Sequence, residues 1–392
     1  MAPPHLVDEI LEEIFLRLPT PAALARVSTA CPSFRRIITA RSFLRRFRKL
    51  HPPPLLGFLG FAAHNGHFHP AEEPHPSAAL ARALANAADF SYSFVPKPNN
   101  GLVSPWSPRD VRDGRVLLAC RSLSEVVEIE AVFTNLAVCD PLSRRYVLLA
   151  PIPKEMTVQQ EHLVEFEPML APIGEEEDET SFKVICTARY KSKLILFVFS
   201  SVTGQWCVAA SPSWSSLGTA EPTWKHLDLF NCIRGCFYWA YLWRDKLLVL
   251  DACTMEFSTV DFRNQPGHKM YISNIVDGTK GALEMLTLAG DYYPISFYLY
   301  HTTQKINGGP SNNWQLKNVM ELPSRCLYST LGATEGFLFF QSFLDQPGVS
   351  HVDFFSLEVK TFEIKKVCMS TYHPRCVNWY FGLPPSLSKP SL

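Results

Sequence analysis

The stretch LFVFSSVTGQW, residues 196–206, holds the pattern on which the fold of most of this chain depends. An apolar run ends at the polar Ser200, and the aromatic Trp206 follows six positions later. Ser and Asp side chains at the end of a strand can hydrogen-bond the backbone of the next turn. The aromatic residue can open the following strand and cover its hairpin partner. The stretch therefore predicts two antiparallel strands joined by a short turn.

The same pattern recurs along the chain. The polar turn positions, 60, 51, 50 and 55 residues apart, are Asp140, Ser200, Asp251, His301 and Ser356. At His301 the turn is longer, and the aromatic residue is displaced to Trp314. A further apolar run comes ahead of each position, and four of these runs directly follow a glycine: Gly114, Gly235, Gly281 and Gly336. A repeat of about 50 residues with about four short strands is typical of a β-propeller blade.

Five such units span about residues 101–367. Residues 51–100 can supply part of a sixth unit, and the stretch CVNWYFG, residues 376–382, can close the ring against them. We therefore expect about six four-stranded blades, with seven as the alternative. The repeat length favours kelch-like over WD-type blades. Two β-sandwiches would also show short strands at regular spacing, but the internal period favours the propeller.

The first fifty residues have a different pattern. Apolar residues recur at helical spacing from Ile10 to Leu18, after acidic residues that suit a helix N-terminus. Pro19 is expected to end this helix, and Thr20-Pro21 is a typical start for the next. Two more short helices are predicted, after Pro32 and over residues 42–50. A unit this small buries little surface and needs support from a partner or from the rest of the chain.

These residues resemble the F-box motif over roughly residues 5–48. The positions that carry the resemblance are Leu6, Glu9-Ile10-Leu11, Ile14-Phe15, Leu18-Pro19, Leu24, Arg26-Val27-Ser28, Cys31 and Phe34-Arg35-Arg36. The chain departs from the motif at Val7, where proline is usual, at Pro32, where a basic residue is common, and at Phe34, where tryptophan is usual.

The resemblance implies a substrate-receptor subunit of an SCF-type cullin-RING ubiquitin ligase. The F-box would bind a Skp-type adaptor, and through it a cullin, while the second domain recruits an unknown protein substrate. The adaptor-facing residues that it implies are Leu6, Ile10, Leu11, Leu18, Pro19, Leu24, Val27 and Phe34. The alternative is an adaptor-independent interaction scaffold whose F-box is degenerate at Val7 and Phe34. The expected fold class is α+β multi-domain, with a helical F-box over residues 1–50 and an all-β propeller over residues 51–392.

The C-terminal part is also similar to the F-box-associated, propeller-like domains of large plant families, particularly those of grasses. The stretches VCDPLSRRYVLL and GQWCVAASPSW carry this similarity.

Composition gives no support to several other classes of function. Lys+Arg and Asp+Glu number 37 each, so net charge gives no reason to expect nucleic acid or a membrane surface as partner. Seven basic residues between Arg35 and Lys49 are expected to lie mainly on solvent-exposed helix faces. Acidic residues stand where a secretory signal needs a cationic start, and the eleven cysteines are scattered. We expect a cytoplasmic or nuclear protein with reduced thiols.

No catalytic motif is found, so we expect neither an enzyme nor a cofactor. The sequence has no phosphate-binding glycine loop, G-x-S-x-G or H-E-x-x-H motif. The histidines at 64, 67, 69 and 75 lie in a predicted loop, and Cys232 and Cys236 lack further ligands at zinc-finger spacing. The acidic run EEEDE, residues 175–179, is expected to be an exposed connection. Candidate aromatic anchors for a substrate are Trp106, Trp214, Trp224, Trp243 and Tyr292-Tyr293, although each also suits a core position.

Overall fold

The computed structural model divides the chain into two compact units, Met1–Pro54 and Leu55–Leu392, which are described separately below. The structure describes residues 7–19, 21–51, 53–60, 67–97, 104–120, 135–157, 161, 163–172, 180–219, 227–241, 246–261, 270–278, 283–292, 295–304, 314–323, 326–334, 336–344, 351–371, 374 and 377–382.

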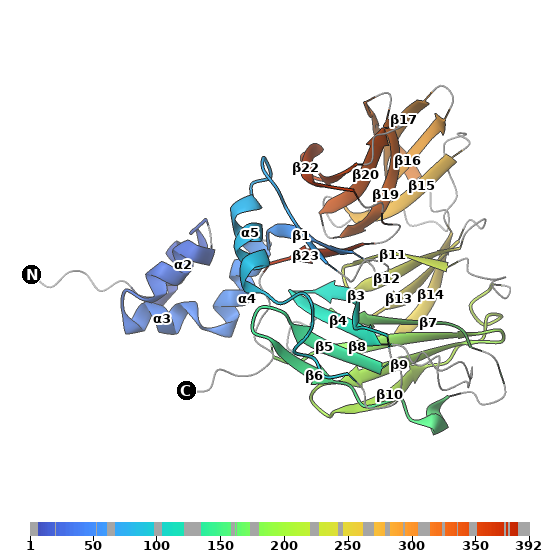
Figure 1. Cartoon of the computed structure of the whole chain (residues 1–392), viewed down its shortest axis with the longest axis horizontal. Helices are drawn as coiled ribbons and strands as arrows, with labels where there is room; N and C mark the ends of the chain where they lie inside the picture. Colours follow the sequence, from blue (N-terminus) through green and yellow to red (C-terminus); the bar gives the residue numbers. More distant parts are fainter. Residues whose placement is uncertain are drawn as a thin grey trace, which may run out of the picture. The chain divides into compact units, whose positions relative to one another are not determined.

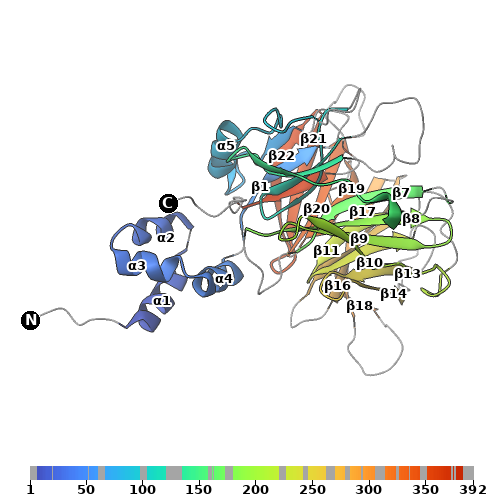
Figure 2. The same ribbon diagram turned by 90° about the horizontal axis from the view of Figure 1, so that it is seen from below.

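The first unit holds four short helices (Figure 2). They are α1 (Asp8–Leu16), α2 (Pro21–Ser28), α3 (Pro32–Ile38) and α4 (Arg41–Leu50). Their core consists of Phe15, Leu16, Leu24, Ile37, Ile38, Phe43 and Phe47. The four predicted helices are confirmed, but α1 ends at Leu16, so Leu18 lies beyond the helix rather than on its apolar stripe. At the start of α3, the Cys31 Sγ accepts a hydrogen bond from the Phe34 backbone N–H at 3.5 Å.

In the described residues of the second unit, all elements are strands apart from one α-helix and a short 3-10 helix, η3 (Lys154–Met156). Five four-stranded antiparallel sheets follow one another along the chain. They are β3 (Ser107–Arg112), β4 (Arg115–Cys120), β5 (Asn135–Asp140) and β6 (Arg145–Leu148); β7 (Leu163–Leu170), β8 (Lys183–Tyr190), β9 (Leu194–Ser200) and β10 (Gln205–Ala210); β11 (Leu227–Ile233), β12 (Cys236–Tyr241), β13 (Lys246–Asp251) and β14 (Glu256–Asp261); β15 (Met270–Asp277), β16 (Leu283–Tyr292), β17 (Ile295–Gln304) and β18 (Trp314–Glu321); and β19 (Cys326–Thr334), β20 (Phe337–Leu344), β21 (Val352–Glu358) and β22 (Glu363–Ser370).

A sixth sheet joins the two ends of this unit. It contains β1 (Leu55–Gly60), β2 (Phe68–Pro70) and β23 (Val377–Phe381), in the order β2-β1-β23. Phe58 of β1 pairs with His69 of β2 on one side and with Trp379 of β23 on the other. We call this sheet the closing blade. The predicted closure of the ring by the C-terminal stretch is confirmed, and the described residues form six blades.

Hydrophobic clusters between neighbouring sheets show that the ring is closed. They join β3–β6 to β7–β10, then to β11–β14, then to β15–β18, then to β19–β22, and finally, through the closing blade, back to β3–β6. Each blade therefore buries its two faces against its two neighbours, as in a propeller. Figure 1 shows the strands of these blades. The fold is the predicted one, a small helical domain followed by an all-β propeller.

Two of the glycines that precede apolar runs have a clear backbone role. Asp113-Gly114 is a two-residue turn with φ angles of 51° and 74°. Arg234-Gly235 is a second such turn, with φ angles of 50° and 75°. Positive φ at both central residues is the type I′ geometry, which matches the twist of the strands that it joins. The turns fix the register of β3 with β4 and of β11 with β12.

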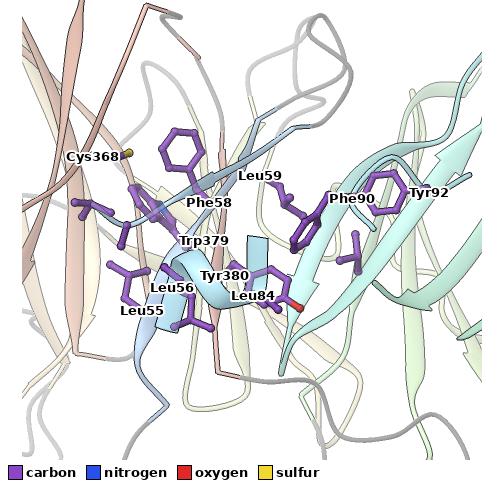
Figure 3. Packing of buried hydrophobic residues seen from close by; sticks show 14 of the residues in the cluster. Leu55, Leu56, Phe58, Leu59, Leu84, Phe90, Tyr92, Cys368, Trp379 and Tyr380 are labelled. Carbon is purple, nitrogen blue, oxygen red and sulfur yellow. The ribbon is translucent and has the colours of Figure 1, made fainter. Parts of the chain in front are cut away.

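Among the described residues the closing blade has three strands, and the segment of residues 71–97 lies beside it. This segment contains α5 (Ala78–Ala87), which contacts β1 and β2. Its backbone N–H groups bond both flanking blades, from Glu72 to the Val367 carbonyl at 2.7 Å and from Asp89 to the Pro141 carbonyl at 2.9 Å. Figure 3 shows Phe90 and Leu84 of this segment in one cluster with Phe58 and Trp379.

Candidate functional site

Helix α1 carries a row of exposed apolar side chains. Val7, Ile10 and Ile14 are 55%, 48% and 46% exposed. Their spacing of three and four residues places them on one side of the helix. Figure 2 shows α1 within the helical unit. The opposite side buries Phe15 and Leu16 in the core. A helix that is apolar on two sides buries one of them within its own unit and presents the other for a partner.

The residues implied by the F-box resemblance fall into three groups. Ile10 and Pro19 are exposed, and Leu24 is buried at 6% exposure in the helical core. The half-buried residues that pack against this core are Leu11, Leu18, Val27 and Phe34. Leu6 lies outside the described residues. Leu24 thus serves the helical core, and its assignment to the adaptor surface stays a prediction.

Phe34 has a defined place in this unit. Its ring meets the ring of Phe15 edge to face, with centroids 5.0 Å apart. Phenylalanine therefore fills the position where the motif usually has tryptophan, while staying partly open to solvent.

Two members of the exposed row were not among the adaptor residues inferred from the sequence. Val7 is a departure from the motif and Ile14 is one of the positions that carry the F-box resemblance, but the resemblance implies neither of them as adaptor-facing. The helical spacing already linked both to Ile10. Which side of the stripe is covered depends on the packing of α3 and α4, so the spacing alone did not show their exposure.

Ion pairs hold α1 against α3 and α4. Arg36 donates to Asp8 at 2.6 Å and Arg46 to Glu12 at 2.8 Å, and Arg46 also pairs with Glu13. Exposed pairs contribute little to stability, typically about 0.2–1 kcal/mol each. They pair two arginines of the basic run between Arg35 and Lys49 with acidic residues of α1, and so help to orient that helix.

Some of the aromatic residues proposed as substrate anchors can be placed in the structure, and these are buried. Trp106 donates from its indole N–H to the carbonyls of Val95 and Pro96, both at 3.2 Å, and is buried. Trp214 is buried and donates to the Tyr190 carbonyl at 3.0 Å. The remaining candidates, Trp224, Trp243 and the Tyr292-Tyr293 side chains, lie outside what the structure describes.

The described residues of the histidine cluster do not form a metal site. His69 stacks on Phe58 with centroids 4.6 Å apart, and His75 Nδ1 accepts from the Ser77 backbone N–H at 3.2 Å. Over the described part of the chain, no three His, Cys, Asp or Glu side chains group as metal ligands. His64 and the acidic run at 175–179 fall outside that part. Likewise, no described helix has the length and apolar character needed to span a bilayer.

One buried polar network in the propeller was not predicted. Glu284 on β16 accepts from His301 Nε2 on β17 at 2.6 Å and from Lys317 Nζ on β18. Burial lowers the pKa of His301, against the effect of the Glu284 carboxylate. Burial acts to raise the pKa of Glu284, but the hydrogen bonds from Lys317 and His301 outweigh it and leave the pKa below its usual value. Both carboxylate oxygens have donors, so the network suits a structural role within one blade.

The fold and the exposed row define a two-module chain, in which a small helical unit precedes a closed propeller. Residues 4–46 match the F-box domain family. The chain therefore carries an F-box domain at its N-terminus, followed by a six-bladed β-propeller.

Comparison with solved structures gives only distant similarity. The chain is similar to a GH43 protein of Bacillus licheniformis at 11% identity and a TM-score of 0.34, covering 75% of this chain and 60% of that one. It is also similar to the GH93 α-L-arabinofuranosidase of Fusarium graminearum at 14% identity and a TM-score of 0.36, covering 69% and 82% of the two chains. No curated protein sequence matches the chain.

Proposed function

We propose that this protein is the substrate-receptor subunit of an SCF-type cullin-RING ubiquitin ligase. The observation that carries the proposal is the F-box domain at residues 4–46, with the exposed apolar row on α1, in front of a propeller. F-box domains in general bind Skp-type adaptors. In this proposal the adaptor links the chain to a cullin, and the propeller recruits a protein for ubiquitin transfer.

The proposed adaptor surface consists of the exposed row together with other residues that the F-box resemblance implies. Its members are Leu6, Val7, Ile10, Leu11, Ile14, Leu18, Pro19, Val27 and Phe34. Leu24 supports it from the core. Ile10 has the greatest value for a test, because it is implied by the motif and is also exposed on the helix.

We also propose a non-catalytic role, without cofactor, in the cytoplasm or the nucleus. The ten cysteines that the structure describes are all free thiols, which supports a reducing compartment. The kelch-like character of the blades and the kinship with the plant F-box-associated domains are part of the same proposal. They rest on the repeat length and on the two similar stretches of sequence.

The test is binding of the purified full chain to a purified Skp-type adaptor. Ile10→Asp places a charge in the exposed row and should weaken adaptor binding by about tenfold or more, as expected for an interface anchor. Leu80→Asp is the matched control, because Leu80 is an exposed leucine on helix α5 of the propeller. The control should bind the adaptor as the unchanged chain does.

Two outcomes would contradict the proposal. One is failure of the intact chain to bind the adaptor at any concentration reached, and the other is equal binding by Ile10→Asp and Leu80→Asp. Leu24→Asp is unsuitable for this test, because it puts a charge into the helical core and reports unfolding.

The second candidate function is an adaptor-independent scaffold. The departures at Val7 and Phe34 favour it, since both positions lie on the proposed adaptor surface. In cells with the proteasome blocked, a receptor should accumulate ubiquitinated partners that a chain without residues 1–54 still binds but leaves unmodified. A scaffold should hold partners whose ubiquitination and abundance are the same with either chain.

A further inference from the structure

The outer strand of the β3–β6 blade carries a compact group of exposed apolar residues. Leu142, in the turn before β6, is 36% exposed, and Tyr146 and Leu148 on β6 are 41% and 46% exposed. Three large apolar side chains are thus open within seven residues. We call Leu142, Tyr146 and Leu148, with Arg144 and Arg145, the β6 edge. Figure 1 shows β6 at the margin of the propeller.

The closing blade explains why this side of β6 is open. Tyr146 pairs with Cys139 and Leu148 with Ala137, and both partners on β5 belong to the cluster shared with the closing blade. Tyr146 and Leu148 therefore face the side on which the neighbouring blade has three strands instead of four. The segment of residues 71–97 covers this side only in part. Phe94 approaches Tyr146, with ring centroids 6.4 Å apart.

The backbone of β6 is also open along this edge. Leu149 donates to the Leu136 carbonyl at 3.0 Å, and hydrogen-bonded and non-bonded pairs alternate along an antiparallel ladder. By this alternation, the N–H and C=O groups of Tyr146 and Leu148 point away from β5. Because β6 is the last strand of its sheet, these groups have no partner among the described residues.

The edge of β22 shows the contrasting case. Its Val367 carbonyl accepts from the Glu72 backbone N–H at 2.7 Å, and its Met369 N–H donates to the Glu72 carboxylate at 3.4 Å. That edge is therefore closed by the chain itself. Proteins commonly protect edge strands in this way against pairing with other chains, and β6 lacks this protection.

The charge of the β6 edge is basic. Arg144 and Arg145 are exposed, and the turn that presents Arg144 is held by Asp140, which accepts from the Leu142 and Ser143 backbone N–H groups at 2.9 Å and 3.2 Å. Asp89 accepts hydrogen bonds from Ser91 and Ser93, and its carboxylate also interacts electrostatically with Arg144. The edge thus carries two exposed arginine residues beside an apolar strand.

We infer that the β6 edge binds an extended segment of a partner protein by strand addition, and that this segment alternates apolar residues with others and carries acidic residues at one end. Backbone hydrogen bonds to Tyr146 and Leu148 would supply affinity, and the arginines would select the acidic end. A second copy of this chain would bring further arginines to the same edge, so charge complementarity favours a different, acidic protein. The identification of this partner as the ligase substrate rests on the proposed function.

The test uses the full chain and a fluorescent ten-residue peptide in which valine alternates with threonine and three glutamates stand at one end. A matched peptide has three lysines in place of the glutamates. Fluorescence anisotropy should show binding of the acidic peptide about tenfold tighter than that of the lysine peptide, because charge-assisted hydrogen bonds are lost in the second. Amide hydrogen exchange of residues 144–149 should slow when the acidic peptide is bound.

Leu148→Pro and Leu148→Thr separate strand addition from side-chain contact. Proline removes the outward N–H without removing a ladder hydrogen bond, a position that edge strands tolerate. Threonine loses the apolar side chain but keeps the N–H. Leu148→Pro should bind the acidic peptide at least about fivefold more weakly than Leu148→Thr, since it also loses a backbone hydrogen bond.

If Leu148→Pro does not fold, peptide binding by the variant Arg144→Asp tests the inference instead. Arg144 has a φ of 54°, which aspartate also adopts, so the turn is preserved. This variant should lose affinity for the acidic peptide and gain affinity for the lysine peptide. Thermal unfolding of each variant shows that it is folded.

Three results would overturn the inference. They are equal binding of the two peptides, equal binding by the two Leu148 variants, and a concentration-dependent dimer of the unchanged chain that Leu148→Pro abolishes, which would assign the edge to a second copy. Adaptor binding distinguishes this inference from the proposed function, because Leu148→Pro should bind the Skp-type adaptor as the unchanged chain does. If the chain binds the acidic peptide but does not bind the adaptor, the proposed function is refuted. The inference that the β6 edge binds an extended acidic segment then still stands.

Discussion

At the scale of single residues, the charged network of Glu284, His301 and Lys317 ties the stability of the propeller to pH. Burial leaves His301 with a pKa below its usual 6.5, and hydrogen bonds leave Glu284 with a pKa below its usual 4.5. The unfolded chain therefore binds protons at a higher pH than the folded chain does. Both groups contribute stability above their usual pKa, and this stability is lost as pH falls.

This sign gives the first prediction. The free energy of unfolding, measured with urea at a series of pH values, should fall as pH drops below about 6.5 and fall further below about 4.5. His301→Gln should make the upper part of this curve shallower. The variant should not remove the pH dependence in this range completely, because burial also lowers the pKa of His69 and His75. A slope unchanged by His301→Gln would contradict the assignment.

At the scale of elements, the closing blade depends on β23. Trp379 stacks on Phe339 of β20 with centroids 3.8 Å apart and meets Phe58 of β1 edge to face at 5.3 Å. Tyr380 donates to the Gly114 carbonyl of the β3–β4 turn at 2.7 Å. One short strand thus joins three blades, and the ring is closed by side chains from both ends of the propeller (Figure 3).

Trp379→Ala should therefore destabilise the whole propeller. Removing a buried tryptophan typically costs about 3–5 kcal/mol of the free energy of unfolding. Leu316→Ala, on the outer strand β18, is the control, because Leu316 is 59% exposed and its removal should change stability by less than about 0.5 kcal/mol. Similar urea midpoints for the two variants would show that β23 does not hold the ring.

At the scale of the whole molecule, the chain has two separate cores. The helical cluster of Phe15, Ile38 and Phe43 contains residues of the first unit alone, and each of the five propeller clusters contains residues of the second. The two units are also very different in size, with the division at Pro54.

A chain of residues 55–392 should consequently fold without the F-box. Its melting temperature should lie within a few degrees of that of the propeller transition in the full chain, because no propeller cluster loses a member. Residues 1–54 alone should be marginally stable, since so short a chain buries little surface, and should become helical on addition of the Skp-type adaptor. Circular dichroism measures both, and an unfolded 55–392 chain would contradict the separation of the cores.

Much of the fold follows from local sequence. The spacing of apolar residues between Ile10 and Leu50 specifies short helices, because side chains three and four apart share a helix face. The apolar runs that end at Asp140, Ser200 and Asp251 specify strands and turns for the same kind of local reason. Even the ring closure was visible, since an unpaired apolar strand at each end of a propeller needs a partner.

Burial was decided only by the tertiary structure. The F-box resemblance implied Leu24 and Ile10 as members of one adaptor surface, but the packing of four helices buries the first and leaves the second exposed. From the sequence, Trp106 and Trp214 were candidate anchors that suited a core position better. In the structure both are buried, and carbonyls distant in the sequence accept from their indole N–H groups. The exposure of Tyr146 and Leu148 depends on a blade built from both ends of the propeller. Periodicity reports the faces of an element, but which face is covered depends on chain segments far away in the sequence.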